Sequence, residues 1–373
     1  AMAAPAFTAV ADFGDFPGFE GDGPGRPEIV AMSTKSIRVQ TIAGAVLFGP
    51  AVLPGGGDGG NVTIADFDGD GAPEFGVVGS TLYVVYDPAC GDPKFPGECA
   101  SGAMNGILWQ ATVAENSCAI MGSTVFDFEG DGAAEVVYAD ECFIRVFAGK
   151  DGQVIWSHPR SSATWYEAPI VADSDGDGRS ELITGYSSYV GSCGGPDPIF
   201  AGLRCTAEFA CPTAALSCDA DLCRCLADAD CGDPDMACVD PLPNSPGAGK
   251  VCRAKYTPRV GLRVFSDNNW VGSRPIWNQH SYSVTHVESD GTIPQGSMVP
   301  RNWEVGGLNN FRQNTQDELG LIQSPDITVE GTEYGKTCSA DNPILPMEAE
   351  VCNRGLLPLD PPVEVGFYDK DPD

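Results

Sequence analysis

Short apolar stretches alternate with acidic, glycine-rich segments through the first half of the chain. Three acidic segments each have an apolar run before them and another after them. The runs before the segments are Val62–Ile64, Thr124–Val125 and Ile170–Val171, and those after them are Phe75–Val78, Val136–Tyr138 and Leu182–Ile183. Runs of this length next to Gly- and Asp-rich turns are typical of strands. The pattern therefore predicts strand, tight acidic loop, strand, three times over.

A second pattern follows each of these pairs. A further apolar run leads through a turn to a strand that contains tryptophan, and one such turn is Lys150-Asp151-Gly152. The runs pair as Leu82–Asp87 with Ile107–Trp109, Ile144–Phe147 with Val154–Trp156, and Leu262–Asp267 with Pro275–Trp277. Each unit thus holds about four strands, and stacking units around an axis buries the faces that one unit leaves open. We expect the repeated tryptophan to lie in the core between units.

The acidic segments align without gaps and carry the candidate chemistry. Numbered from the first aspartate, they have acids at positions 1, 3, 5 and 9 and glycine at position 6. The acids are Asp66, Asp68, Asp70 and Glu74; Asp127, Glu129, Asp131 and Glu135; and Asp173, Asp175, Asp177 and Glu181. Ca²⁺ takes about six to eight oxygen ligands, which alternate loop residues can supply. The carbonyls at position 7, from Ala72, Ala133 and Arg179, can add to the set.

Two other interpretations of these loops compete with calcium binding. An EF-hand places its last acid at position 12 on a helix, whereas here the last acid is at position 9 and a strand follows. A single copy could be an ordinary solvated Asp-Gly turn, but three copies in the same register favour metal binding.

Two degenerate copies flank the intact ones. Near the start, Asp12, Glu20, Asp22 and Glu28 match the four acidic positions if two short insertions are allowed. Later, residues 284–291 keep only Glu288 and Asp290. We therefore expect three to four bound Ca²⁺ ions, with the later copy the weakest candidate.

These loops resemble the FG-GAP/VCBS repeats of integrin-type β-propellers, in which such loops bind Ca²⁺. The resemblance covers about residues 7–323, apart from an insertion, and Glu129 departs from it because the repeat has Asp there. The stretch from Leu262–Phe265 to Asn310–Asn314 is similar to bacterial secreted propellers. The resemblance implies an all-β propeller with four or five blades visible here, whereas such rings usually have about seven.

Charge and cysteine content point to the environment. Asp and Glu number 52 against 21 Lys and Arg, a formal charge of −31. Such a surface repels phosphate backbones and anionic lipid, so we predict no nucleic-acid partner. The longest apolar stretch, Ile42–Leu53, is too short to span a bilayer. The 15 cysteines indicate an oxidising compartment, and we predict a secreted or cell-surface protein.

Nine cysteines fall in one insertion, residues 193–255. They are Cys193, Cys205, Cys211, Cys218, Cys223, Cys225, Cys231, Cys238 and Cys252. Because nine is odd, one is free or reaches a cysteine elsewhere. By proximity, Cys90 with Cys99, Cys118 with Cys142, and Cys338 with Cys352 are natural local pairs, although sequence alone does not fix connectivity. With no CxxC pair and three histidines, zinc is disfavoured.

The pattern changes from about residue 326. Alternating strands are expected at 326–330, 347–355 and 363–368, similar to the opening of CARDB-type Ig-like domains. Residues 326–373 would form roughly half of such a sandwich.

No catalytic motif emerges from the sequence. There is no GxSxG elbow, P-loop, dinucleotide fingerprint or HExxH. His280 and His286 flank Tyr282 and could form a polar site, although hydrogen-bonded structural residues are the commoner interpretation. We predict a non-enzymatic module that binds a protein or glycan ligand at a cell surface. The alternatives are a structural spacer in a large surface protein and a propeller polysaccharide lyase or hydrolase.

Overall fold

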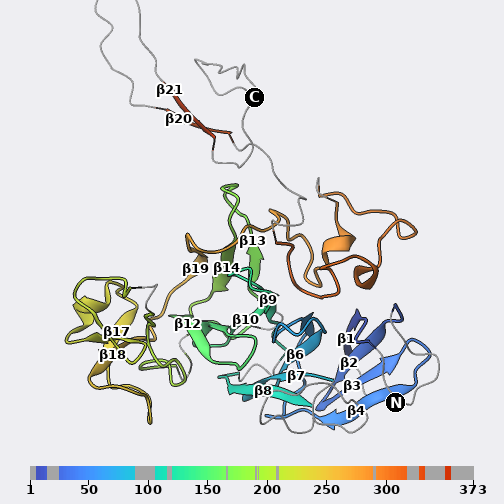
Figure 1. The fold of residues 1–373 in the computed structure, drawn as a ribbon, viewed down its shortest axis with the longest axis horizontal. Helices are drawn as coiled ribbons and strands as arrows, with labels where there is room; N and C mark the ends of the chain where they lie inside the picture. Colours follow the sequence, from blue (N-terminus) through green and yellow to red (C-terminus); the bar gives the residue numbers. More distant parts are fainter. Residues whose placement is uncertain are drawn as a thin grey trace, which may run out of the picture.

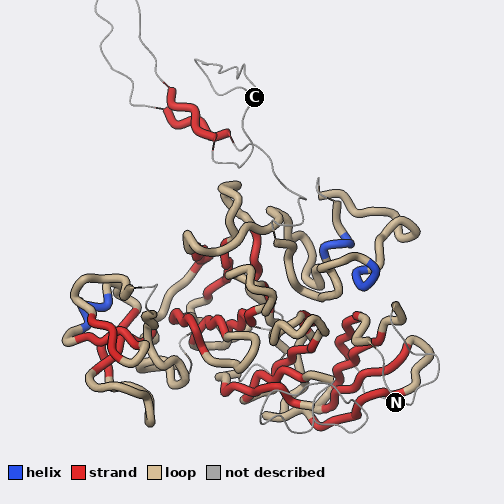
Figure 2. Tube along the Cα trace, in the orientation of Figure 1, coloured by secondary structure: helices blue, strands red, loops and turns tan. Residues whose placement is uncertain are grey.

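A computed structural model gives a chain built almost entirely from β-strands (Figures 1 and 2). It describes residues 6–14, 25–88, 106–115, 120–164, 167–189, 191, 193–206, 210–288 and 291–316, with the backbone of 327–331 and 349–353. The helices of this described part are three short 3₁₀ turns. They are η1 (Asp228–Cys231), η2 (Val284–His286) and η3 (Asn302–Glu304).

Four antiparallel sheets follow one another along the chain, and in each sheet every strand pairs with the next. The first holds β1 (Ala6–Ala11), β2 (Glu28–Ser33), β3 (Ser36–Thr41) and β4 (Val46–Val52). The second holds β5 (Thr63–Ala65), β6 (Glu74–Val78), β7 (Leu82–Tyr86) and β8 (Ile107–Thr112). The third holds β9 (Thr124–Phe126), β10 (Glu135–Ala139), β11 (Phe143–Phe147) and β12 (Val154–Pro159). The fourth holds β13 (Ile170–Ala172), β14 (Glu181–Tyr186) and β19 (Gly261–Ser266).

The sheets pack face to face, so the two sides of a strand serve two different cores. On β6 and β7, Phe75 and Val84 join the core shared with the first sheet. Tyr83 and Val85 join the core shared with the third sheet. Alternate side chains of a strand point to opposite faces, and here both faces are buried. This explains why the strands read as continuous apolar runs. Trp109 lies in one of these inter-sheet cores.

One segment runs along the inner edge of all four sheets. We call residues 309–316 the inner segment. Its partners are the first strand of each sheet or the residue that follows that strand. The hydrogen bonds are Asn309 Nδ2 to the Asp12 carbonyl (2.6 Å), a two-way pair between Ile64 and Phe311 (3.1 and 2.9 Å), Val125 N to the Arg312 carbonyl (3.2 Å), and Asn314 Nδ2 to the Val171 carbonyl (2.9 Å). The inner segment therefore ties the four sheets together.

Within the described residues, the fourth sheet has three strands and no outer strand like those of the other three sheets. The sequence predicts this strand at Pro275–Trp277, and that prediction is wrong. Proline cannot donate to a strand ladder, and Trp277 instead stacks on Tyr282, with ring centroids 4.4 Å apart. Strand β19 consequently ends the sheet with Leu262 70% and Val264 52% exposed. Nor does the degenerate loop at 284–291 keep the repeat's form, since η2 begins it.

The cysteine-rich insertion forms its own small sheet (Figure 1). Its strand order is β15-β16-β18-β17. The strands are β15 (Ser217–Asp219), β16 (Leu222–Cys225), β17 (Met236–Val239) and β18 (Lys250–Ala254). Four disulfides lie within it, Cys205–Cys218, Cys211–Cys223, Cys225–Cys238 and Cys231–Cys252.

The ninth cysteine of the insertion reaches the third sheet. Cys193 is bonded to Cys142, which lies in the turn between β10 and β11. The local pairing of Cys118 with Cys142 is therefore wrong, because folding brings Cys142 next to a cysteine 51 residues away in the sequence. Cys90, Cys99, Cys118 and Cys338 lie outside the described residues.

Beyond the inner segment, the described backbone holds two strands, β20 (Ile327–Gly331) and β21 (Ala349–Asn353). They pair antiparallel, with Val329 opposite Val351. Both were predicted as strands. The third predicted strand, at 363–368, lies outside the described residues.

Candidate metal centres

Each intact acidic loop occupies the same place in its sheet. It joins the first strand to the second, between β5 and β6, between β9 and β10, and between β13 and β14. The degenerate copy near the start joins β1 to β2. Sequence repetition has thus become repetition in space, with one acidic loop at the equivalent turn of each successive sheet.

The aspartate at position 1 organises each loop. In the first loop, Asp66 accepts the N–H of Gly69 on one oxygen (2.7 Å) and that of Gly71 on the other (2.9 Å). The corresponding bonds in the other loops are Gly130 and Gly132 to Asp127 (2.7 and 2.8 Å), and Gly176 and Gly178 to Asp173 (2.7 and 3.0 Å). The three loops therefore fold the same way around their first carboxylate.

Glycine is needed at two positions for this fold. Positions 4 and 6 have positive φ in every copy, for example +72° at Gly130 and +95° at Gly132. Side chains other than glycine disfavour this left-handed region. The sequence predicts the requirement at position 6, and the structure adds position 4.

The glutamate at position 9 opens the second strand and reaches back to the loop. Its carboxylate accepts the N–H of the residue after the first aspartate, from Phe67 to Glu74 (2.7 Å), from Phe128 to Glu135 (3.0 Å) and from Ser174 to Glu181 (2.6 Å). The degenerate copy repeats this bond from Phe13 to Glu28 (3.0 Å), and its Asp12 accepts the N–H of Gly14 and Gly25. The other two predicted ligands of that copy, Glu20 and Asp22, lie outside the described residues.

The loops bring three carboxylates together in each case. Oxygen atoms within 4.8 Å of one another come from Asp66, Asp68 and Asp70; from Asp127, Glu129 and Glu135; and from Asp173, Asp175 and Glu181. The predicted ligands outside these groups are Glu74, Asp131 and Asp177. The last two accept the N–H of Ala133 (3.0 Å) and Arg179 (2.8 Å), as Asp70 accepts that of Ala72 (2.7 Å). These three donors are the residues at position 7.

Burial works against the charge of these carboxylates. It raises the pKa of Asp66 and Asp173, and it raises the pKa of Glu74 to about 10. The neighbouring acids raise these pKa values further. Among the described residues, no loop carboxylate of the three intact copies forms an ion pair with arginine or lysine. Carboxylates crowded and partly buried in this way can be stabilised either by taking up a proton or by binding a cation.

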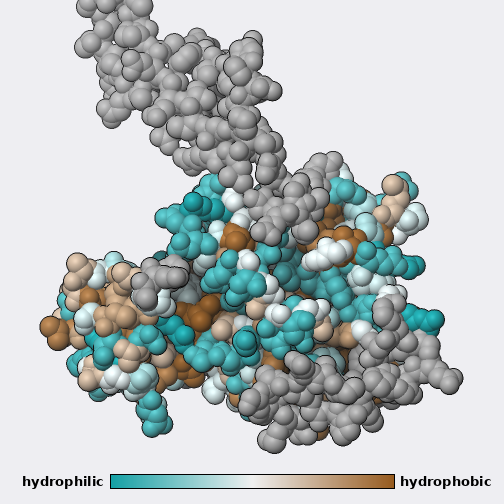
Figure 3. Space-filling view, in the orientation of Figure 1, coloured by the Kyte–Doolittle hydropathy of each residue, from teal (hydrophilic) through white to brown (hydrophobic). Residues whose placement is uncertain are grey.

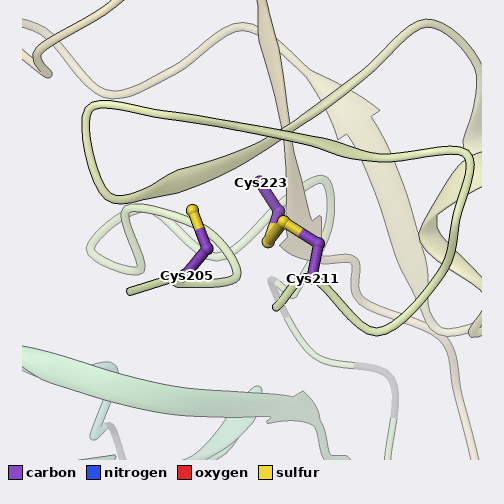
Figure 4. A group of neighbouring side chains, drawn as sticks. All are labelled: Cys205, Cys211 and Cys223. Carbon is purple, nitrogen blue, oxygen red and sulfur yellow. A yellow bond between two sulfur atoms is a disulfide. The ribbon is translucent and has the colours of Figure 1, made fainter. Parts of the chain in front are cut away.

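The chemistry of the donor set suits Ca²⁺. Every side-chain donor is a carboxylate oxygen, and hard oxygen ligands in flexible loops are what Ca²⁺ prefers. The sulfur clusters of the insertion are a different matter. Cys205, Cys211 and Cys223 lie close together (Figure 4), but all three are in disulfides and offer no thiolate to a metal.

A cavity of about 280 Å³ lies between the first two loops and the inner segment. The residues that line it include the first aspartates of the two loops, Asp66 and Asp127, together with Asn310 and Gln313 of the inner segment. Gln316 Nε2 donates to the carbonyl of Asp127 (2.6 Å). The inner segment thus lies next to the first two intact acidic loops.

The predicted polar site around Tyr282 has a different composition from the one expected. Tyr282 is buried and donates to Asn314 Oδ1 (3.1 Å), whereas His280 and His286 are exposed. The residue that sequence reasoning missed is Arg312, which is buried beside Trp277. The only hint in the sequence is the polar run Asn309–Asn314.

No protein-family model matches the sequence, and no curated protein is similar to it. Among solved structures, the chain is similar to the V. cholerae biofilm matrix protein Bap1, with 15% identity and a TM-score of 0.37 over 83% of this chain and 42% of that one. It is also similar to a protein of unknown function from Bacteroides caccae, with 15% identity and a TM-score of 0.24 over 42% of this chain and 49% of that one. The chain spans less than half the length of either. At these scores the similarity assigns neither a fold family nor a function.

The surface is consistent with the acidic composition. Hydrophilic side chains cover much of the centre of the face shown in Figure 3. In the described part of the chain, no helix has the length and apolar character needed to cross a membrane.

Proposed function

We propose that the chain is an exported β-propeller, stabilised by Ca²⁺, that recognises a protein or glycan ligand at a cell surface. One observation carries the proposal. Three acidic loops with the same hydrogen-bond frame occupy the same turn of three successive sheets, and each gathers three carboxylates within 4.8 Å. Repetition of a costly feature at equivalent places is best explained by a shared ligand.

The order and packing of the strands support a propeller. Four meandering sheets follow one another, one segment bonds to the first strand of each or to the residue after it, and apolar cores lie between successive sheets. Radial repetition is a common way for such sheets to bury their faces. We propose that these four sheets are blades, and that a full ring has about seven.

Calcium would act structurally in this molecule. The ion would neutralise the acids at positions 1, 3, 5 and 9 of each loop and so couple metal binding to folding of the blade. Extracellular calcium modules bind with dissociation constants of about 10⁻⁴ to 10⁻³ M. Five disulfides support an oxidising, extracellular setting of this kind.

Thermal unfolding tests the role of calcium. At a concentration about 100 times the dissociation constant, each site stabilises the fold by about 2.7 kcal/mol. Three sites should therefore raise the Tm by about 10 °C or more over the same protein in EDTA. Mg²⁺ at equal concentration should act much less, because it demands a smaller, octahedral site. Equal melting temperatures in EDTA and in calcium would contradict the proposal.

A further inference from the structure

Arg312 of the inner segment is a buried cation without an anionic partner. It is 1% exposed, as are Arg145 and Arg160. Arg145 pairs with Asp140 and Asp197, and Arg160 pairs with Glu167. Among the described residues, no carboxylate pairs with Arg312.

The contacts of Arg312 are all neutral. Its Nε donates to the carbonyl of Ser123 (2.8 Å), one terminal nitrogen donates to the carbonyl of His280, and the other lies 3.4 Å from Thr124 Oγ1. A guanidinium has five N–H groups, so these acceptors within the described chain use three. Burial without a counterion lowers the pKa of Arg312 to about 10, which reflects the free-energy cost of holding this charge away from water.

A cavity of about 290 Å³ lies next to Arg312. Arg312 contributes to its wall, and so do Ile170, Trp277, Asn278, Gln279 and His280. The guanidinium carbon lies 5.7 Å from the centroid of the Trp277 ring. The wall thus combines one cation, two amides and apolar surface, which is the usual make-up of a small-molecule site.

We infer that this cavity binds the carboxylate of a ligand with a ring-sized body, paired with Arg312. A guanidinium matches a carboxylate through two parallel hydrogen bonds. One cation suits a single negative charge better than a phosphate dianion, particularly in a chain of formal charge −31. The volume accommodates one six-membered ring, and the amides of Asn278 and Gln279 can meet polar substituents.

This inference deepens the proposed recognition function and rests on it for its biological meaning. The carboxylate could belong to a sugar acid or to an apolar ring acid. D-glucuronate and benzoate represent these two sources, and D-glucose is the neutral match of the first. Titration calorimetry on the full chain in calcium and physiological salt measures all three.

We expect at least one carboxylate to bind with a dissociation constant near 1 mM or below, and D-glucose to bind at least about tenfold more weakly. His280→Glu places a negative charge on the cavity wall and should weaken binding of the carboxylate ligand by about tenfold. His286→Glu is the matched control, since His286 is also exposed but does not line the cavity, and it should leave binding unchanged.

Three results would overturn the inference: no heat from either carboxylate, binding of glucose as tight as that of the better carboxylate, or equal effects of the two histidine variants on carboxylate binding. Failure here is separable from failure of the calcium proposal. A calcium-dependent Tm without carboxylate binding would refute the carboxylate site and leave the calcium proposal standing. Carboxylate binding without an effect of calcium on the Tm would refute the structural role of the metal and leave the carboxylate site standing.

Discussion

Glu135 is a carboxylate whose ionised form would be unfavourable without a metal and favourable beside a bound cation. It is 6% exposed, and its oxygen lies within 4.8 Å of oxygens from Asp127 and Glu129. Burial and the neighbouring Glu129 raise its pKa. Without a metal the side chain therefore favours its protonated form, and a bound cation would reverse that preference.

Replacing Glu135 by Gln separates these two states. In EDTA the variant should melt within about 2 °C of the parent, because an amide resembles a protonated carboxyl in size and polarity. In calcium it should lose the stabilisation of one site, about 2.7 kcal/mol, and its Tm should fall by several degrees relative to the parent.

The matched control for Glu135→Gln is Glu304→Gln. Glu304 is an exposed partner of Arg301 on η3, far from any acidic loop in the sequence, and such pairs contribute little. Its calcium response should equal that of the parent. Identical calcium responses from the two variants would count against the loop as a metal site.

Asp197 illustrates the opposite case, a buried carboxylate that is fully paired. It receives Arg145 Nε (2.7 Å) and the hydroxyl of Ser157 (2.5 Å). Burial alone would raise the pKa of Asp197, but Arg145 and these hydrogen bonds outweigh it and lower the pKa below 3.8. The ionised form thus stabilises the fold above about pH 4, and that contribution is lost as the pH falls through the lowered pKa.

Asp197→Asn should therefore be strongly destabilising at neutral pH and less so in acid. At pH 7 we expect a loss of about 3 kcal/mol in the free energy of unfolding, because Arg145 keeps only Asp140 as an anionic partner. Urea titrations at pH 7 and near pH 3 measure the difference from the parent, which should narrow in acid. The control is Asp219→Asn, since Asp219 is 52% exposed. A pH-independent difference for Asp197→Asn would show that this carboxylate does not act through its charge.

At the scale of elements, the cysteine-rich insertion is attached to the third sheet by ion pairs and a disulfide. The ion pair between Asp197 and Arg145 joins the insertion to β11. The carboxylate of Asp235 contacts the imidazole of His158 on β12 (3.3 Å) and the guanidinium of Arg259 (2.7 Å). The disulfide between Cys193 and Cys142 adds a covalent link. These contacts hold the small sheet against the third large sheet. The odd number of cysteines in the insertion allowed for a bond to a cysteine elsewhere. The local sequence predicts neither the partner of that bond nor the ion pairs, because each contact joins distant parts of the chain.

The disulfide between Cys142 and Cys193 can be tested directly. Peptide mapping without reduction should recover it, together with the four disulfides inside the insertion. The double variant Cys142→Ser/Cys193→Ser should lose about 2–4 kcal/mol of stability, because the bond closes a loop of 51 residues, while the other four bonds stay intact. Recovery of a peptide that links Cys118 to Cys142 would refute this connectivity.

At the scale of the whole molecule, the inner segment connects the four sheets to one another. It bonds to the inner edge of all four sheets, although it lies far from three of them in sequence. The fourth sheet ends at β19 with no outer strand among the described residues, so the stack is complete on its inner side and incomplete on that outer edge. A ligand beside Arg312 would sit on this same inner segment, within reach of its contacts with the third sheet.

Much of the architecture could be read from local pattern. Apolar runs around Asp66, Asp127 and Asp173 located nearly all of the inner strands, because strand formation and the Asp-Gly turn depend on neighbouring residues. The same register placed the carboxylates on equivalent turns. The grouping of Asp127, Glu129 and Glu135 could likewise be predicted from local sequence, because all three lie within nine consecutive residues.

Other features depended on contacts between distant residues, and only the folded chain decided them. Cys142 is bonded to Cys193 and not to Cys118, and Trp277 stacks on Tyr282 and is not part of the predicted strand. Arg312 is buried with no carboxylate partner among the described residues. A pairing between distant segments is governed by how sheets stack and which charges end up enclosed, and these are properties of the packed whole. The sequence by itself thus determined the acidic loops and the strands on either side of them. The tertiary structure decided how the sheets are joined and where the charge of Arg312 is buried, because both depend on contacts between distant residues.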